Sequence, residues 1–163
     1  MRKFAIFSGV VLLLFGYQLW DDGLYSLYRE FPGATVCFYT GTDEKLPAGR
    51  AASVIANGST LILSCSPDAA ADLRRGLKSL KGESVSFEGG AADAERVLEL
   101  YAVKSLRTEN LTGGGLIITI MYGRSPYLCG GLKVNGDFVN IQIAVNETTG
   151  WVTIGTPLIL GSY

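Results

Sequence analysis

The sequence predicts an α+β fold in which antiparallel strands form a sheet with one face on an apolar core. Residues 139–145 alternate strictly between Val or Ile and small or polar residues, which is the period of a half-buried strand. Asn57-Gly58 separates two β-rich runs and is typical of a tight hairpin turn. Residues 66–81 combine helix-capping signals with apolar side chains at helical spacing.

The first element in the chain is an uncharged apolar run, Phe4–Trp20, which follows Arg2 and Lys3. As a helix, its seventeen residues span about 25 Å of hydrocarbon. The run ends on aromatic and acidic residues, not on the small residues of a signal-cleavage site. We therefore expect residues 1–20 to form a signal anchor, with the N-terminus in the cytoplasm and the rest outside the cell membrane. Secretion after signal cleavage is the alternative.

The next segments lead from this anchor into a globular domain. Residues 21–33 place apolar side chains at helical spacing and end on a Pro-Gly pair, which predicts a juxtamembrane helix and turn. Residues 34–40, 53–56 and 60–64 are β-rich, and the hairpin dipeptide joins the last two. We expect residues 34–163 to form a single extracytoplasmic α+β domain, because this length supports one core.

Two helices are predicted in the middle of the chain. The first begins with Ser66 as N-cap and Pro67 in the first turn, and Gly82 is its predicted C-cap. A strand over residues 84–88 precedes the second helix, which is predicted over residues 92–105 from its single apolar face.

The last third of the chain is predicted to be β. Residues 116–122, 139–145 and 151–155 read as strands. A strand that buries Val and Ile on one face turns Asn140 and Gln142 to the other. These two side chains are therefore the candidate binding face, and ordinary solvation of an antiparallel sheet is the alternative interpretation.

Composition excludes several function classes. The chain has no His, so it lacks Ser-His-Asp and Cys-His nucleophiles and His-containing metal sites. With Arg2 and Lys3 set aside from the 14 basic residues, the chain after Trp20 carries 12 basic and 15 acidic groups, a net charge of −3. Nucleic-acid binding needs surplus positive charge, so no nucleic-acid partner is expected. No cofactor or metal is expected either.

The three cysteines, Cys37, Cys65 and Cys129, form no C-x-x-C pair and are too few for an all-Cys zinc site. In an oxidising exterior, one bridge and one free thiol are compatible with this number. Cys37 and Cys65 are the preferred disulfide pair if their strands are neighbours. The other interpretation is three small buried apolar side chains.

An envelope hydrolase that uses two carboxylates is the alternative function, because acid–acid pairs need no His. Asp43, Glu44 and Glu88 are the candidate acids, and no motif joins them. Such an enzyme requires two carboxylates that converge in a cleft with pKa values pushed apart.

The C-terminal strands resemble the YwmB family, secreted or membrane-attached proteins of spore-forming Gram-positive bacteria with a TATA-box-binding-protein-like label. The residues that carry the resemblance are Val139–Val145 (VNIQIAV), Trp151–Ile159 (WVTIGTPLI) and the final Tyr163. The resemblance implies an antiparallel sheet with helices packed on one face, in two loosely repeated halves. It also implies a link to envelope or sporulation processes, and it supplies no catalytic or binding residue.

These observations together predict a membrane-tethered, non-enzymatic extracytoplasmic module. Its expected partners are the membrane, through residues 4–20, and an envelope protein or polymer, through the sheet face that carries Asn140 and Gln142.

Overall fold

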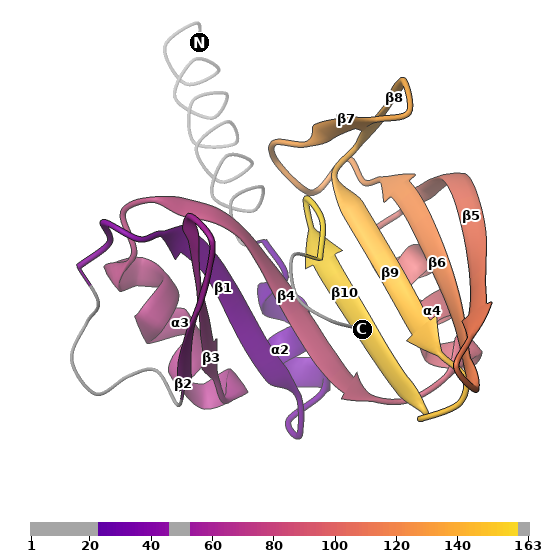
Figure 1. The fold of residues 1–163 in the computed structure, drawn as a ribbon, viewed down its shortest axis with the longest axis horizontal. Helices are drawn as coiled ribbons and strands as arrows, with labels where there is room; N and C mark the ends of the chain where they lie inside the picture. Colours follow the sequence, from indigo (N-terminus) through magenta and orange to yellow (C-terminus); the bar gives the residue numbers. More distant parts are fainter. Residues whose placement is uncertain (1–22, 46–52, 160–163) are drawn as a thin grey trace, which may run out of the picture.

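The computed structural model describes residues 23–45 and 53–159, so the predicted anchor Phe4–Trp20 lies outside the described residues. Within the described ranges the chain folds into one large antiparallel sheet with helices beside it (Figure 1), which confirms the α+β class. No helix in these ranges is long and apolar enough to cross a membrane.

The described helices are α2 (Tyr25–Glu30), α3 (Pro67–Gly76) and α4 (Ala91–Leu100). The strands of the large sheet are β1 (Thr35–Gly41), β2 (Ser53–Asn57), β3 (Thr60–Cys65), β4 (Leu80–Glu88), β5 (Lys104–Gly113), β6 (Leu116–Arg124), β9 (Ile141–Asn146) and β10 (Trp151–Thr156). A small second sheet pairs β7 (Leu132–Val134) with β8 (Asp137–Val139).

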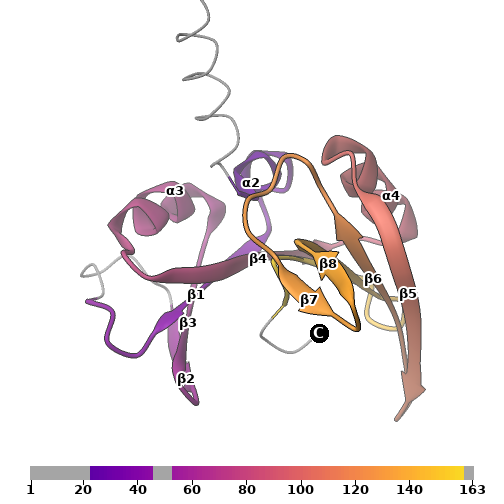
Figure 2. The same cartoon turned by 90° about the horizontal axis from the view of Figure 1, so that it is seen from above.

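The eight strands follow the order β2-β3-β1-β4-β10-β9-β6-β5, and every neighbouring pair is antiparallel. The helices α2, α3 and α4 lie on one face of this sheet, as Figure 2 shows from above. We call the opposite face the helix-free face.

The core lies between the sheet and the helices. Alternate residues of β1, β4, β9 and β10 point into it, and α3 and α4 add their apolar faces. The most buried members are Val36, Phe38, Leu73, Val85, Val97, Ile141, Ile143, Val152 and Ile154. Burial of each such side chain stabilises the fold by about 1.5–3 kcal/mol, so this layer dominates the stability.

The first long helix ends earlier than the sequence predicts. α3 stops at Gly76, and Leu80, which was expected in the helix, begins β4 opposite Thr40. The backbone N–H groups of Lys78 and Ser79 donate to the Glu44 carboxylate, not to carbonyls of a continuing helix. Pairing with β1 therefore overrides the helical spacing, and Gly82 is a strand residue instead of a C-cap.

The second helix is also shorter than predicted. α4 ends at Leu100, and Ala102 adopts a positive φ of 45° that turns the chain out of the helix. Residues 104–105, expected in that helix, begin β5, which pairs with β6 from end to end apart from a bulge between Ser105 and Arg107. β5 is an edge strand with most of its side chains exposed, so it lacks the alternation by which a half-buried strand is recognised.

The strands of the large sheet run between two ends, which we call the proximal and the distal end. At the proximal end β1 and β10 finish and β4 begins, and the backbone N–H of Leu24 lies 2.5 Å from the Glu83 carboxylate there. At the distal end β4 and β9 finish and the β5–β6 turn lies (Figure 1). Gly23, the first described residue, is therefore at the proximal end.

Candidate functional site

Asn140 is not on a solvated face. Its side chain is only 2% exposed. Its Oδ1 accepts from the Ser125 backbone N–H at 2.7 Å, and its Nδ2 donates to the carbonyls of Ser125 and Leu128 at 2.9 and 2.8 Å. The expectation that Asn140 contributes to a binding face is wrong, because the described partners of its side chain belong to the loop that leads to β7.

Gln142 points to the helix-free face, as predicted, but it is covered there. It is 2% exposed, and its Oε1 accepts from the backbone N–H of Ile159 at 2.9 Å. Ile159 packs into a small apolar cluster with Ile118, Ile120 and Ala144 on this face. The chain after β10 therefore takes the position where a ligand of Gln142 was expected, and the candidate binding face at Asn140 and Gln142 is corrected.

The candidate Cys37–Cys65 disulfide is not formed, because both residues carry free thiols. Their strands β1 and β3 are neighbours, but Cys65 is opposite Val36 in the register. Opposed residues share a face and successive residues alternate, so Cys37 and Cys65 point to opposite faces of the sheet. Burial raises the pKa of both thiols, that of Cys65 to about 11, which disfavours the reactive thiolate.

The three candidate acids do not form one cleft. The Glu44 carboxylate accepts from the backbone N–H of Ser79, just before β4 begins. Glu88 is the last residue of that strand. A nine-residue strand is roughly 25–30 Å long, so these two carboxylates lie far apart. Asp43 lies next to Glu44, and its carboxylate lies close to Gly41.

Glu44 ties the loop after β1 to the start of β4. Its carboxylate accepts from the Ser79 hydroxyl, from the backbone N–H groups of Lys78 and Ser79, and from the Thr40 hydroxyl at 3.2 Å. These donors, the Ser79 hydroxyl first, lower the pKa of Glu44 from 4.5 to about 2. A carboxylate held ionised in this way is suited to holding the loop and not to donating a proton.

We expect the Glu44 contacts to make stability pH-dependent. Because the pKa is lowered in the folded state, the stabilisation is complete above about pH 4.5 and is lost as pH falls toward 2. Urea midpoints of the native chain and Glu44→Gln, measured from pH 7 to pH 2, should differ by a constant amount at neutral pH and converge below pH 4.5. Glu95→Gln, which removes an exposed charge on α4, is the matched control. A pH-independent gap for Glu44→Gln contradicts the assignment.

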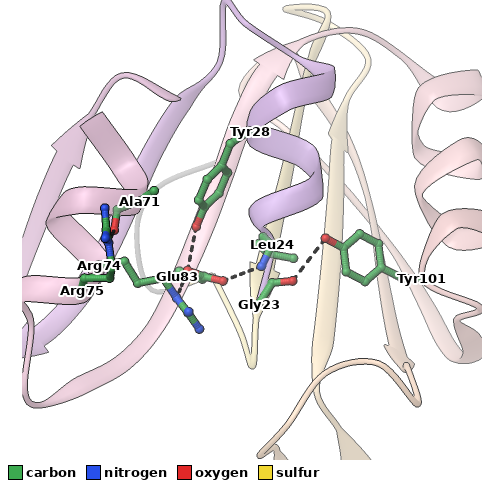
Figure 3. A network of polar contacts seen from close by, with 8 residues as sticks. All are labelled: Gly23, Leu24, Tyr28, Ala71, Arg74, Arg75, Glu83 and Tyr101. Carbon is green, nitrogen blue, oxygen red and sulfur yellow. Dashed lines mark hydrogen bonds and ion pairs between the residues drawn. The ribbon is translucent and has the colours of Figure 1, made fainter. Parts of the chain in front are cut away.

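A buried carboxylate that the sequence interpretation missed lies at the proximal end. Glu83 is 2% exposed and accepts from the Leu24 backbone N–H at 2.5 Å and the Tyr28 hydroxyl at 2.7 Å (Figure 3). The Arg74 Nε of α3 lies 3.3 Å from it. The available signal was the alternation Glu83, Val85, Phe87, which places the carboxylate on the buried face of β4.

The contacts of Glu83 join three elements. They hold the start of α2 and the last turn of α3 against β4. Burial and the adjacent Glu83 carboxylate raise the pKa of Tyr28 well above its usual value, so its hydroxyl stays a donor. The Tyr101 hydroxyl, at the end of α4, donates to the Gly23 carbonyl at 3.2 Å. This cluster therefore fixes the position at which the chain enters the domain.

Gly23 also belongs to the cluster around Glu83, where its lack of a side chain is required. It has a φ of +55°, and a Cβ at this position would lie 1.9 Å from the Glu83 Oε1. Two hollows flank it. One of about 410 Å³ is bordered by Arg74 and Leu132, and one of about 720 Å³ is bordered by Tyr25 and Tyr127.

The distal end carries an exposed apolar surface on the helix-free face. The register places Leu111 opposite Ile118 and Trp151 opposite Asn146, in one row across β5, β6, β9 and β10. Leu111, Leu116 and Trp151 are each more than 40% exposed. We call these three residues the distal patch, and a hollow of about 390 Å³ lies beside its two leucines.

A polar row lies next to the distal patch on the same face. The Arg107 guanidinium lies 4.6 Å from the centre of the Tyr122 ring, and its Nε lies 3.0 Å from Glu109. The Tyr122 hydroxyl donates to Glu109 at 3.4 Å. Aromatic, Arg and apolar side chains in one exposed area are the composition typical of protein interfaces.

No known protein family, curated protein or solved structure matches this chain.

Proposed function

We propose that this protein is a membrane-tethered, non-enzymatic extracytoplasmic module of the bacterial cell envelope that binds an envelope protein or polymer. What supports the tether is the apolar run Phe4–Trp20, with basic residues before it and acidic residues after it. A role in sporulation or cell-wall processes, a TATA-box-binding-like fold and two loose halves belong to the proposal through the YwmB resemblance. In this proposal the two halves are β2-β3-β1-β4 and β10-β9-β6-β5 of the strand order.

The single observation that carries the binding role is the distal patch. Leu111, Leu116 and Trp151 are exposed on the helix-free face at the end of the sheet farthest from Gly23. A tethered domain presents this end to the envelope, away from the membrane. Exposed apolar side chains that are gathered on one surface are typical of interaction sites.

Photo-crosslinking from intact membranes tests this role. A photoreactive phenylalanine analogue replaces Leu116 in the full chain, and in the matched control it replaces Glu95, an exposed residue of α4. We expect a discrete adduct from position 116 and none from position 95. A protein adduct is sensitive to protease, and a glycan adduct collapses after muramidase treatment. Equal labelling at the two positions, or no adduct at 116, rejects the distal patch as the binding surface.

A further inference from the structure

Exposed apolar side chains also gather around Gly23 at the proximal end. Tyr25, Leu100 and Tyr127 border one of the hollows beside Gly23, and Leu132 borders the other. Phe138 is next to Gly131, where a Cβ would lie 2.5 Å from the Phe138 ring. These five side chains are between 39% and 48% exposed, and we call them the proximal patch.

The proximal patch lies among basic residues. Those at or next to the proximal ends of strands and helices are Lys45, Arg74, Arg75, Lys78, Lys81, Lys104, Arg124 and Lys133. The acidic residues at this end are Asp43, Glu44, Glu83, Glu99 and Asp137. The Glu83 and Arg74 charges offset each other, whereas the Glu44 carboxylate keeps its negative charge while it accepts from N–H and hydroxyl donors. The basic side chains at this end outnumber the acidic ones.

The distal end has the opposite charge. Asp68 and Asp93 lie in the first turns of α3 and α4, Glu88 ends β4, and Glu147 lies in the turn between β9 and β10. The chain after Trp20 is acidic overall, with a net charge of −3. A positive proximal end in an acidic domain orients the molecule toward an anionic surface.

The sequence before Gly23 indicates that this anionic surface is the membrane. The apolar run ends at Trp20, three residues before Gly23, and three residues of chain reach at most about 10 Å. If the run is the membrane anchor, Gly23 lies within about 10 Å of the membrane interface, and the proximal patch surrounds it. Tyr, Phe and Leu beside Lys and Arg are the composition of surfaces that lie at the lipid headgroups.

We propose that the proximal patch lies on the anionic lipid headgroups of the membrane's outer surface, so that the β7–β8 hairpin contacts the bilayer and the distal patch faces outward. The hairpin extends beyond the large sheet at this end (Figure 1), and it carries the exposed Leu132 and Phe138 on its two faces. Arg124, stacked over the Phe138 ring at 5.4 Å, supplies positive charge beside the apolar contact. This inference rests on the proposed membrane tether.

The test uses the full chain reconstituted in vesicles of phosphatidylglycerol and phosphatidylcholine. An environment-sensitive fluorophore is attached at Leu132→Cys in a Cys129→Ser background, and at Leu116→Cys in the same background as the control. We expect a blue-shifted emission at position 132 and a water-like emission at position 116. The shift at 132 should decrease in vesicles of phosphatidylcholine alone and at high salt, because the lipid charge is then absent or screened.

A charge substitution measures how much one basic side chain contributes to contact with the lipid surface. Each Lys or Arg near an anionic lipid surface favours contact by about 1 kcal/mol, so Lys133→Gln should lower the ratio of docked to undocked domain about fivefold. Arg96→Gln, an exposed position on α4, is the matched control and should leave the ratio unchanged.

Flotation separates the two proposals. A chain that does not float with the vesicles rejects the tether and, with it, this inference. A chain that floats but keeps a water-like signal at position 132 rejects the inference alone. A shift at 132 that is independent of lipid charge and follows protein concentration indicates contact between copies of the chain, which also overturns it.

Discussion

Glu83→Ala should lower the free energy of unfolding by about 3 kcal/mol. The substitution leaves the Leu24 N–H, the Tyr28 hydroxyl and the Arg74 guanidinium without their shared acceptor. Removing one partner of a buried ion pair costs about 3–5 kcal/mol, and the lower value applies because the Arg74 side chain is 26% exposed and partly solvated. Urea unfolding of the full chain in detergent, followed by near-ultraviolet circular dichroism, measures the change.

Glu83→Gln provides a variant that is expected to fold. Its amide keeps one acceptor oxygen and loses the charge, so the expected cost is about 1–2 kcal/mol. Amide hydrogen exchange at Leu24 and through α2 should rise more than exchange in β9. Glu88→Ala, at the exposed distal end of the same strand, is the control and should change stability by less than about 0.5 kcal/mol. Equal effects at Glu83 and Glu88 contradict the role of the Glu83 contacts as a clamp that holds α2 and α3 against β4.

Asn140→Ala should lower the free energy of unfolding by about 2–3 kcal/mol. The side chain makes three buried hydrogen bonds, and its removal leaves polar groups of Ser125 and Leu128 unsatisfied. Exchange of amide hydrogens over residues 125–131 should rise, because this loop loses its attachment to β9. Chemical denaturation and mass-spectrometric hydrogen exchange measure both effects.

This prediction separates a structural Asn140 from a ligand-binding one. Asn140→Asp, which keeps the acceptor but places a charge where two donors were, should be at least as destabilising. Asn57→Ala on the exposed edge strand β2 is the control and should be nearly neutral. If Asn140→Ala leaves stability unchanged and reduces only crosslinking at position 116, the sheet-face interpretation is restored.

The Glu83 clamp and the membrane proposal are physically connected. Glu83 holds Leu24 and Tyr28 against β4, so the chain leaves the domain at a fixed point of the proximal end. Under the membrane proposal, a fixed exit beside Tyr127 and Leu132 gives the domain one orientation at the membrane, whereas a loose linker would allow many. Loosening the clamp with Glu83→Gln should therefore reduce the blue shift at position 132 even where the domain remains folded.

Much of the fold could be predicted because its elements carry local signals. Alternating Val and Ile residues identified β9, and the Asn-Gly dipeptide placed the β2–β3 hairpin. The start of α3 follows from Pro67, whose φ suits the first helical turn. Each of these signals depends on side chains within a few residues of one another, so neighbours elsewhere in the fold do not change them.

The candidate site was predicted less well, because its geometry depends on contacts that such local signals do not contain. Period-two alternation correctly assigned Gln142 to the helix-free face, but it cannot show that Ile159 returns to cover that face. It placed Cys37 and Cys65 in neighbouring strands, but the register that separates them is set by pairing between β1 and β3. Glu83 was missed because a carboxylate is assumed to be solvated until its partners, Tyr28 and Arg74, are known.

The sequence by itself determined the fold class, the position of most strands, the acidic charge after Trp20 and the apolar run that predicts a membrane anchor. Only the tertiary structure decided where α3 and α4 end, that β5 is an edge strand, and which polar side chains are buried. The physical reason is that burial, strand register and charge separation between the two ends depend on contacts between residues far apart in the chain. Such contacts turned Asn140 from a candidate binding residue into a structural one, and they brought the proximal patch together around Gly23.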